Sequence, residues 1–199
     1  MAAPDTIFST NNPQQVPALL KDLDACYIDQ PLLAWGSVRR SKKNHGTWHF
    51  YTDDYRFTAL WNKPEMVPDT GCLAAVEVNY TIHENTPYPI ALHHIYKKRW
   101  LSRYWQSRGI RIIVDLNVSA PFLELNMLGI PDGWTTYATH GYNDRIYELE
   151  LEYTAAQRKA GKKNITFLVY GGGNQVKDFC MQDPIITHVS EHRDQVKAV

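Results

Sequence analysis

Strand-like segments alternate with helix-like segments along the second half of this chain of 199 residues. The strand-like segments are residues 73–81, 110–118, 135–139 and 164–170, and each is followed by a loop and then by a helical pattern. Strands joined by helical crossovers run parallel, because a parallel pair needs a long connection. The alternation predicts an α/β fold with a mainly parallel sheet. Four such units are too few to close an eight-stranded barrel, so we expect an incomplete TIM-like barrel or an open doubly wound sheet.

Shorter patterns complete the predicted order of elements. Further strands are expected at residues 32–38, 48–51 and 185–189, and helices at residues 16–27, 53–62, 90–106, 143–160 and 175–181. Residues 1–17 are polar and contain three prolines, which indicates a loosely attached arm. The whole chain, residues 1–199, is expected to form a single domain, because this length supports one sizeable core.

The composition argues against several classes of protein. Hydrophobic residues make up 44% of the chain, and no apolar run approaches the roughly 18 residues of a membrane span. The three cysteines are widely spaced, which argues against a disulfide framework or a zinc ribbon. Lysine plus arginine equals aspartate plus glutamate at 21 each, so no overall basic field attracts nucleic acid. We expect a cytoplasmic protein without membrane contact.

Polar side chains stand near the predicted carboxyl ends of the strands, where ligands gather in parallel α/β proteins. They are Asn79, Asp115, Asn117 and His140. Asp115 and Asn117 share one face of their strand, and a polar residue in a buried parallel strand needs a reason. The four residues are therefore candidate catalytic residues. The alternative is that Asp115 caps the following turn or pairs with a nearby arginine.

Three glycines, Gly171, Gly172 and Gly173, follow a predicted strand and precede a predicted helix. Their N–H groups are candidates to bind a phosphate at the amino end of that helix. Neither GxGxxG nor GxxxxGK[ST] is present, so a plain turn is the alternative and no cofactor is specified. The histidines predict no metal site, since the adjacent His93 and His94 point in different directions on a helix.

Basic residues cluster at two places. A predicted loop carries Arg39, Arg40, Lys42 and Lys43, and one arc of the helix predicted at 90–106 carries Lys98, Arg99 and Arg103. The helical period predicts that these three helix charges share an exposed surface. Because positive side chains contact phosphates and neighbouring aromatic rings stack on bases, both clusters are candidate nucleic-acid-binding residues. The alternative is an ordinary solvated face.

Three blocks of the sequence resemble an uncharacterised family found on phages and plasmids, catalogued as domain of unknown function 4417. Residues 48–64 include Asp53, Asp54, Tyr55, Arg56, Phe57 and Trp61; residues 90–113 include Tyr96, Arg99, Tyr104, Gln106, Gly109 and Ile110; the third block runs from Thr139, His140 and Gly141 to Val169, Tyr170 and Gly171. The family tends to have proline, aspartate, phenylalanine and serine where this chain reads Val78, Asn79, Tyr80 and Thr81. The resemblance implies a mobile-element origin and leaves the activity open.

Three functions are compatible with these observations. The favoured one is a nucleic-acid-associated protein of a mobile genetic element, which binds DNA or RNA through the two basic clusters. The first alternative is an enzyme that acts on a phosphorylated or other small substrate at the strand ends. The second alternative is a non-catalytic protein that binds and disables a host factor. The sequence indicates neither the substrate nor the oligomeric state.

Overall fold

The protein is built on seven parallel strands whose spatial order is their order in the sequence. The computed structural model describes residues 6–36 and 46–191. The strands are β1 (Leu32–Ala34), β2 (Thr47–His49), β3 (Ala74–Val76), β4 (Arg111–Asp115), β5 (Thr136–His140), β6 (Thr166–Tyr170) and β7 (Ile186–Val189). Every neighbouring pair is parallel. The prediction that residues 73–81, 110–118 and 164–170 contribute parallel strands to one sheet is confirmed.

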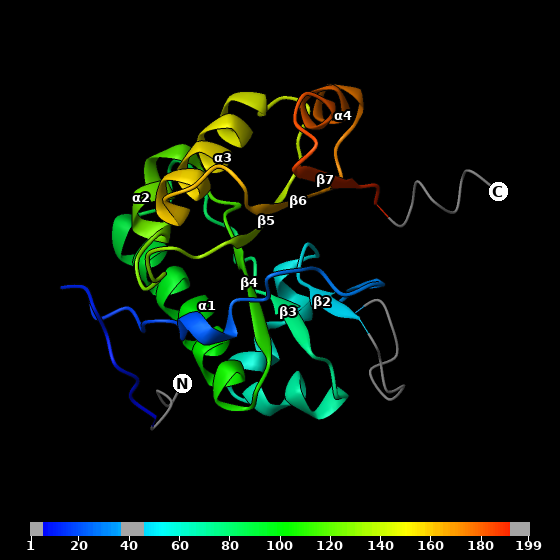
Figure 1. Cartoon of the computed structure of the whole chain (residues 1–199). Coiled ribbons are helices and arrows are strands. Elements are labelled where there is room, and N and C mark those ends of the chain that lie inside the picture. The colour runs from blue at the N-terminus through cyan, green and yellow to red at the C-terminus, as the bar shows by residue number, and fades with distance from the viewer. Residues whose placement is uncertain (1–5, 37–45, 192–199) are drawn as a thin grey trace.

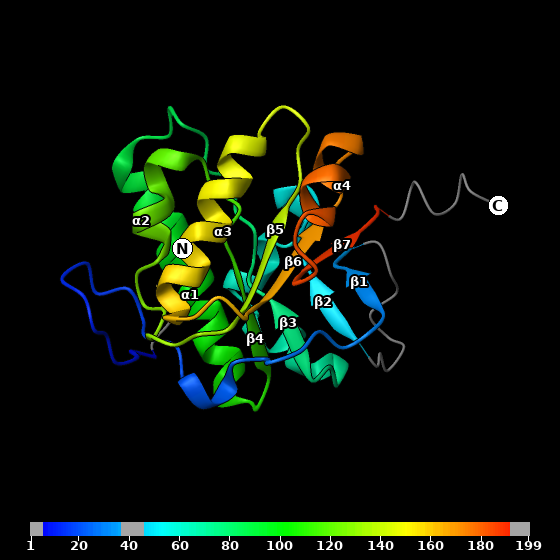
Figure 2. The same ribbon diagram turned by 45° about the horizontal axis from the view of Figure 1, so that its top comes forward.

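The sheet curls into an open half-barrel with the helices along its outer, convex side (Figures 1 and 2). A doubly wound sheet reverses its strand order at a switch point. The sequential order from β1 to β7 excludes that alternative and confirms the incomplete barrel. Among the described residues no pairing joins β7 to β1, so the half-barrel is not closed. Because all strands are parallel, their carboxyl ends lie at the same edge of the sheet, which we call the rim.

Within the described residues, four α-helices follow the central strands. They are α1 (Tyr88–Ser107), α2 (Leu123–Asn126), α3 (Ile146–Ala160) and α4 (Asn174–Met181), and the short 3-10 turn η6 (Ala120–Phe122) precedes α2. The helices predicted at 90–106, 143–160 and 175–181 are confirmed as α1, α3 and α4. These helices are crossovers that pack one face against the sheet. Their apolar residues therefore recur with the helical period, and this periodicity predicts a helix from the sequence.

Two other predicted helices are wrong. Residues 53–62 form the 3-10 turns η2 (Asp54–Arg56) and η3 (Thr58–Trp61), followed by η4 (Pro64–Met66) and η5 (Pro68–Thr70). In residues 16–27 only η1 (Lys21–Leu23) is helical. There the backbone N–H of Leu19 donates to the Gly129 carbonyl oxygen at 2.8 Å, and the N–H of Leu20 donates to Gln106 Oε1 at 2.7 Å. These backbone N–H groups thus donate to distant parts of the chain and not to carbonyl oxygens within a helix.

The two faces of the sheet bury different side chains. In β4, Ile112 and Val114 belong to the main core, which includes residues of the helices, whereas Ile113 belongs to a smaller cluster with Ala138 and Leu168. This alternation follows the two-residue period of a strand. The smaller cluster covers the concave face of the half-barrel.

The segment between η1 and β1 crosses the half-barrel at the amino ends of the strands (Figure 1). The Ala25 N–H donates to the Ile112 carbonyl oxygen at 3.1 Å, between β4 and β5. The Asp24 carboxylate accepts bonds from the N–H and the hydroxyl of Thr135, both at 2.7 Å. This segment covers the amino-terminal side of the concave face, opposite the rim.

The described part of the predicted loose arm packs against α1. The indole N–H of Trp100 donates to the carbonyl oxygen of Thr6 at 2.9 Å, and the rings of Phe8 and Trp100 lie 5.5 Å apart. Val16 is fully buried in the main core. Residues 6–17 are therefore attached to the domain by apolar contacts as well as hydrogen bonds.

Candidate functional site

Asp115, the last residue of β4, lies in a network of charges that is closed to solvent. Its side chain is 0% exposed, and Lys98 Nζ of α1 lies 2.9 Å from its Oδ2. The same ammonium donates to the Asp115 carbonyl oxygen at 2.9 Å, and the Tyr51 hydroxyl donates to Asp115 Oδ1 at 3.1 Å. Burial raises the pKa of Asp115, and the Lys98 charge opposes that rise. The charged partner of Asp115 is thus a lysine, where the sequence suggested an arginine.

A second buried ion pair completes this network. The guanidinium of Arg99 binds the carboxylate of Glu77, and both side chains are fully buried. Arg99 also donates to the carbonyl oxygens of Leu128 at 3.0 Å and Asn126 at 2.7 Å. Glu77 Oε2 accepts a bond from the backbone N–H of Asp115 at 3.3 Å. We call Glu77, Lys98, Arg99 and Asp115 the buried charge network; it joins α1 and the segment after α2 to the ends of β3 and β4.

The prediction of an exposed basic surface on α1 is wrong. Lys98 and Arg99 are 1% and 0% exposed, because they point at the carboxylates of Asp115 and Glu77. Arg103 is half-buried, with its guanidinium carbon 4.8 Å from the centre of the Phe8 ring. Lys98 and Arg99 are therefore not exposed for phosphate contacts. The other predicted cluster, Arg39, Arg40, Lys42 and Lys43, lies outside the described residues.

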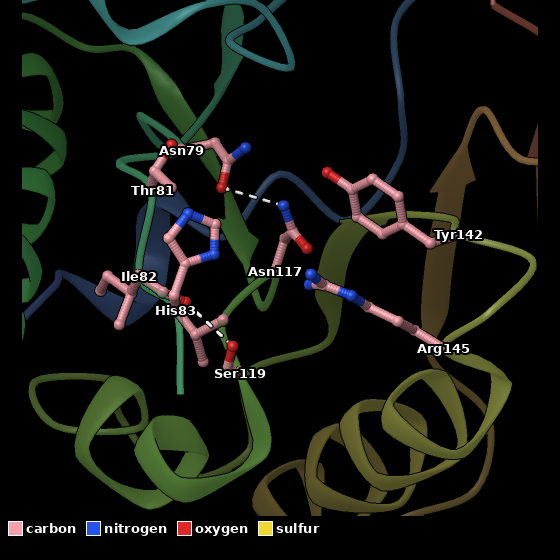
Figure 3. A pocket seen from close by; sticks show the side chains of 9 residues that line it. Asn79, Thr81, Ile82, His83, Asn117, Ser119, Tyr142 and Arg145 are labelled. Carbon is pink, nitrogen blue, oxygen red and sulfur yellow. Dashed lines mark hydrogen bonds between the residues drawn. The ribbon is translucent and has the colours of Figure 1, made fainter. Parts of the chain in front are cut away.

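A cleft of about 220 Å³ opens at the rim, between the loops that follow β3, β4 and β5 (Figure 3). We call it the rim cleft. Its lining consists of Asn79, Thr81, Ile82, His83, Asn117, Val118, Ser119, Tyr142 and Arg145. The predicted candidates Asn79 and Asn117 thus lie together where the strand-end rule places ligands.

The two asparagines are joined to each other and to the buried charge network. Asn117 Nδ2 donates to Asn79 Oδ1 at 3.1 Å, and the backbone N–H of Asn117 donates to Asp115 Oδ1 at 3.2 Å. The bond between the amides does not use the Asn79 amide nitrogen or the Asn117 amide oxygen. Asp115 itself is buried behind Asn117, so in this arrangement it positions a residue of the cleft and does not line it.

Arg145 and His83 face the asparagines from opposite sides of the rim cleft (Figure 3). The guanidinium of Arg145 lies 5.0 Å from the centre of the Tyr142 ring, and its Nη1 lies 3.6 Å from Glu148 Oε2. Burial raises the pKa of Tyr142, and a hydrogen bond with the Asn117 side chain opposes this rise. The rim cleft thus brings together two amides, an imidazole, a phenol and a guanidinium.

His140, the remaining candidate, is separated from the rim cleft by one ring. Its imidazole lies 4.4 Å from the Tyr142 ring, and its Nε2 lies 3.2 Å from Glu191 Oε1. Burial lowers the pKa of His140, while Glu191 opposes this effect. Nearby, burial lowers the pKa of His49 to about 3. His140 therefore belongs to an aromatic group on the concave face, beside the cleft and outside its lining.

The predicted phosphate loop has two of its three backbone donors already engaged. The N–H of Gly171 donates to the Val189 carbonyl oxygen at 2.8 Å, and that of Gly173 donates to Asn143 Oδ1 at 3.0 Å. A Cβ on Gly171 would lie 2.8 Å from the Glu191 carboxylate, so a negative charge already stands beside the loop. A phosphate there would meet repulsion and few free N–H groups.

Among the polar residues of the rim cleft that sequence reasoning missed are His83, Tyr142 and Arg145. All three follow a predicted strand within a few residues, so a search of every strand-to-helix loop for polar side chains would have found them. The helical pattern predicts a helix that begins at Asn143 and includes Arg145, whereas α3 begins one residue after Arg145. Helix ends are the least predictable part of a helix, and here the end decides which way the side chain faces.

Residues 6–36 and 46–191 contain no group of three or more histidine, cysteine, aspartate or glutamate side chains arranged to hold a metal ion. Within the same ranges, no helix combines the length and the apolar character that crossing a membrane requires.

The chain is similar to two proteins of mycobacteriophages. The Gene 1 protein of Mycobacterium phage L5 is 32% identical over 134 residues, which cover 64% of this chain and 57% of that protein. The Gene 1 protein of Mycobacterium phage D29 is 29% identical over 134 residues, which cover 64% of this chain and 48% of that protein. The chain spans about half the length of these curated relatives.

A protein family described as a domain of unknown function, DUF4417, matches residues 8–178. The matched range contains the three blocks that carry the resemblance in the sequence, as well as the rim cleft and the buried charge network. No solved structure matches the chain. The chain therefore belongs to the DUF4417 family and has relatives encoded by phages.

Proposed function

We propose that this phage-related protein is an enzyme that binds and acts on a small polar substrate in the rim cleft. The observation that carries the proposal is the convergence of polar side chains from three successive strand ends: Asn79 after β3, Asn117 after β4, and Arg145 after β5. Ligands of parallel α/β proteins bind at this edge, where each strand contributes a different side chain.

The support beneath the rim cleft favours a site over an ordinary surface hollow. Asn117 is held by Asp115, and Asp115 is held by Lys98 and Tyr51 inside the protein. Groups fixed before the ligand arrives lose less conformational freedom on binding, which raises affinity and precision. His83 and Tyr142 add side chains that can transfer protons, as acid–base catalysis requires.

The size of the rim cleft favours a small molecule. About 220 Å³ is below the roughly 300–1,000 Å³ of sites for drug-sized ligands. Binding of DNA or RNA and binding of a host protein, both predicted from the sequence, stay predictions. Lys98 and Arg99 give the nucleic-acid function no support, because the buried charge network occupies them.

A fragment screen tests the proposal by following the side-chain amide signals of Asn79 and Asn117 by NMR. We expect small polar fragments to shift both signals, and Asn79→Ala or Asn117→Ala to weaken binding about 3- to 10-fold, the effect of one hydrogen bond. Asn174→Ala is the matched control, since Asn174 is exposed at the start of α4 and outside the cleft. Fragments that bind elsewhere, or that bind both cleft variants as tightly as the parent, would exclude this site.

A further inference from the structure

We infer that the ligand of the rim cleft carries an oxyanion, either a phosphate or a carboxylate, which Arg145 binds while Asn79 and Asn117 bind the uncharged remainder. This inference rests on the proposed function and names the chemical class of its substrate. The nine lining residues include Arg145 and no aspartate or glutamate.

The guanidinium of Arg145 has N–H donors available for such a ligand. A guanidinium offers five N–H donors in a planar fork that matches a carboxylate or a phosphate. Its intramolecular carboxylate contact, to Glu148, is 3.6 Å, longer than the roughly 2.7–2.9 Å of a strong charged hydrogen bond. The Glu148 carboxylate also accepts the backbone N–H of Ala120 at 3.3 Å, which holds it outside the lining. The Tyr142 ring lies beside the guanidinium and restricts its orientation.

The amino end of α3 adds positive potential on the same side of the rim cleft. Arg145 is the residue immediately before this helix of 15 residues, and the Arg145 side chain makes no capping hydrogen bond. The first N–H groups of a helix have no partner within the helix, and the aligned peptide dipoles give that end a partial positive charge. An oxyanion at Arg145 therefore gains from both the guanidinium and the helix.

The side-chain amides of Asn79 and Asn117 bind the uncharged part of the ligand. Because their mutual bond uses Asn117 Nδ2 and Asn79 Oδ1, the pair presents an amide N–H on Asn79 and an amide oxygen on Asn117. One donor beside one acceptor suits a hydroxyl group, which can both donate and accept. The predicted class is therefore a small hydroxylated molecule with one anionic group.

The surroundings of the rim cleft select against larger anions. Glu84 and Asp144 are exposed in the loops that follow β3 and β5, each next in sequence to a lining residue, His83 or Arg145. Their negative charges repel a polyanion such as nucleic acid. A single oxyanion in contact with Arg145 is attracted by the guanidinium more strongly than these more distant carboxylates repel it.

Calorimetric titration with four probes tests the inference: inorganic phosphate, glycerol 3-phosphate, glycerate and glycerol. We expect at least one oxyanion to bind more tightly than glycerol. Arg145→Gln should weaken that binding about 10-fold or more, because a hydrogen bond to a charged group contributes about 1.5–3 kcal/mol. Arg158→Gln is the matched control, since Arg158 is an exposed arginine of the same helix. Its affinities should equal those of the parent protein.

The outcomes separate this inference from the proposed function. Binding of the phosphates alone assigns a phosphate group, and binding of glycerate alone assigns a carboxylate. Equal oxyanion affinity in Arg145→Gln and the parent would overturn the inference. It is also overturned if only neutral fragments bind, with shifts at Asn79 and Asn117, in which case the proposed function stands. If neither oxyanions nor fragments shift these signals, both proposals fail.

Discussion

Lys98 and Asp115 form a fully buried ion pair in which one ammonium group contacts two oxygens of the same residue. Nζ lies 2.9 Å from the carboxylate oxygen Oδ2 and 2.9 Å from the carbonyl oxygen of Asp115. The pair thus fixes both the side chain and the backbone at the end of β4, two residues before Asn117. This relationship connects the stability of the domain with the geometry of the rim cleft.

Replacing Asp115 with asparagine should destabilise the protein strongly. The substitution keeps the shape of the side chain but leaves the Lys98 ammonium buried without its counter-charge, which costs about 3–5 kcal/mol. Urea denaturation measures the loss, with Asp178→Asn in α4 as an exposed control. An Asp115→Asn protein that kept the parent's free energy of unfolding and lost ligand binding would instead make Asp115 part of the chemistry.

Arg99→Ala should also destabilise the fold. The substitution leaves Glu77 buried without a charged partner and removes the donors to Asn126 and Leu128, so we expect a loss of about 3–5 kcal/mol in the free energy of unfolding. Arg108→Ala, at the exposed end of α1, should stay within about 0.5 kcal/mol of the parent. A stable Arg99→Ala protein with weakened DNA or RNA binding would restore the nucleic-acid function predicted for this helix.

His49 should make the protein sensitive to acid. Burial lowers its pKa to about 3, against about 6.5 in the unfolded chain. Between these values the unfolded state binds the proton and the folded state does not, so stability is full above pH 6.5 and falls as the pH decreases toward 3. The limiting slope is about 1.4 kcal/mol per pH unit.

His49→Phe keeps a ring against Tyr170 and removes this titration. Urea denaturation between pH 4 and pH 7 should therefore show a flatter acid limb for His49→Phe. The control His83→Asn changes an exposed histidine and should keep the slope of the parent. Equal slopes for His49→Phe and the parent would show that His49 is not the group responsible.

Glu152 should have the opposite dependence on pH. Burial raises its pKa well above the usual value, although the Thr139 hydroxyl donates to its carboxylate. The folded state therefore keeps a proton that the unfolded state releases, and stability contributed by this group is lost as the pH rises above about 4.5. Glu152→Gln should remove that loss, so the variant should gain stability over the parent as the pH is raised from 5 to 8. Glu150→Gln, on an exposed position of α3, should show no such gain.

Much of the fold could be predicted from the sequence because its signals are local. A long amphipathic pattern between two apolar runs forces a crossover, and a crossover forces parallel pairing, so β3, β4 and β6 and the helices α1, α3 and α4 followed directly. The apolar residues of 53–62 recur at intervals of three and four, a spacing that predicts a helix. That spacing also suits consecutive 3-10 turns, and local periodicity does not distinguish the two.

The rim cleft could be predicted in part. The strand-end rule predicts that Asn79 and Asn117 lie at the rim, and both line the rim cleft there, because the rule depends only on strand direction. It also selected Asp115 and His140, but whether a side chain at a strand end faces the rim or the interior depends on its neighbours. Asp115 faces inward because Lys98 and Tyr51 stand there, and those partners come from distant parts of the chain.

The polar arc of α1 separates what the sequence determined from what the tertiary structure decided. The sequence determined that a helix forms and that Lys98, Arg99 and Gln106 share one side of it, because the 3.6-residue period is a local property. Only the tertiary structure decided that this side is buried, since Asp115, Glu77 and the backbone of Leu20 provide partners for these three side chains. Burying a polar group costs free energy unless it has a hydrogen-bond or charge partner inside the protein. These partners come from separate strands and loops, so no periodic pattern in the sequence predicts them.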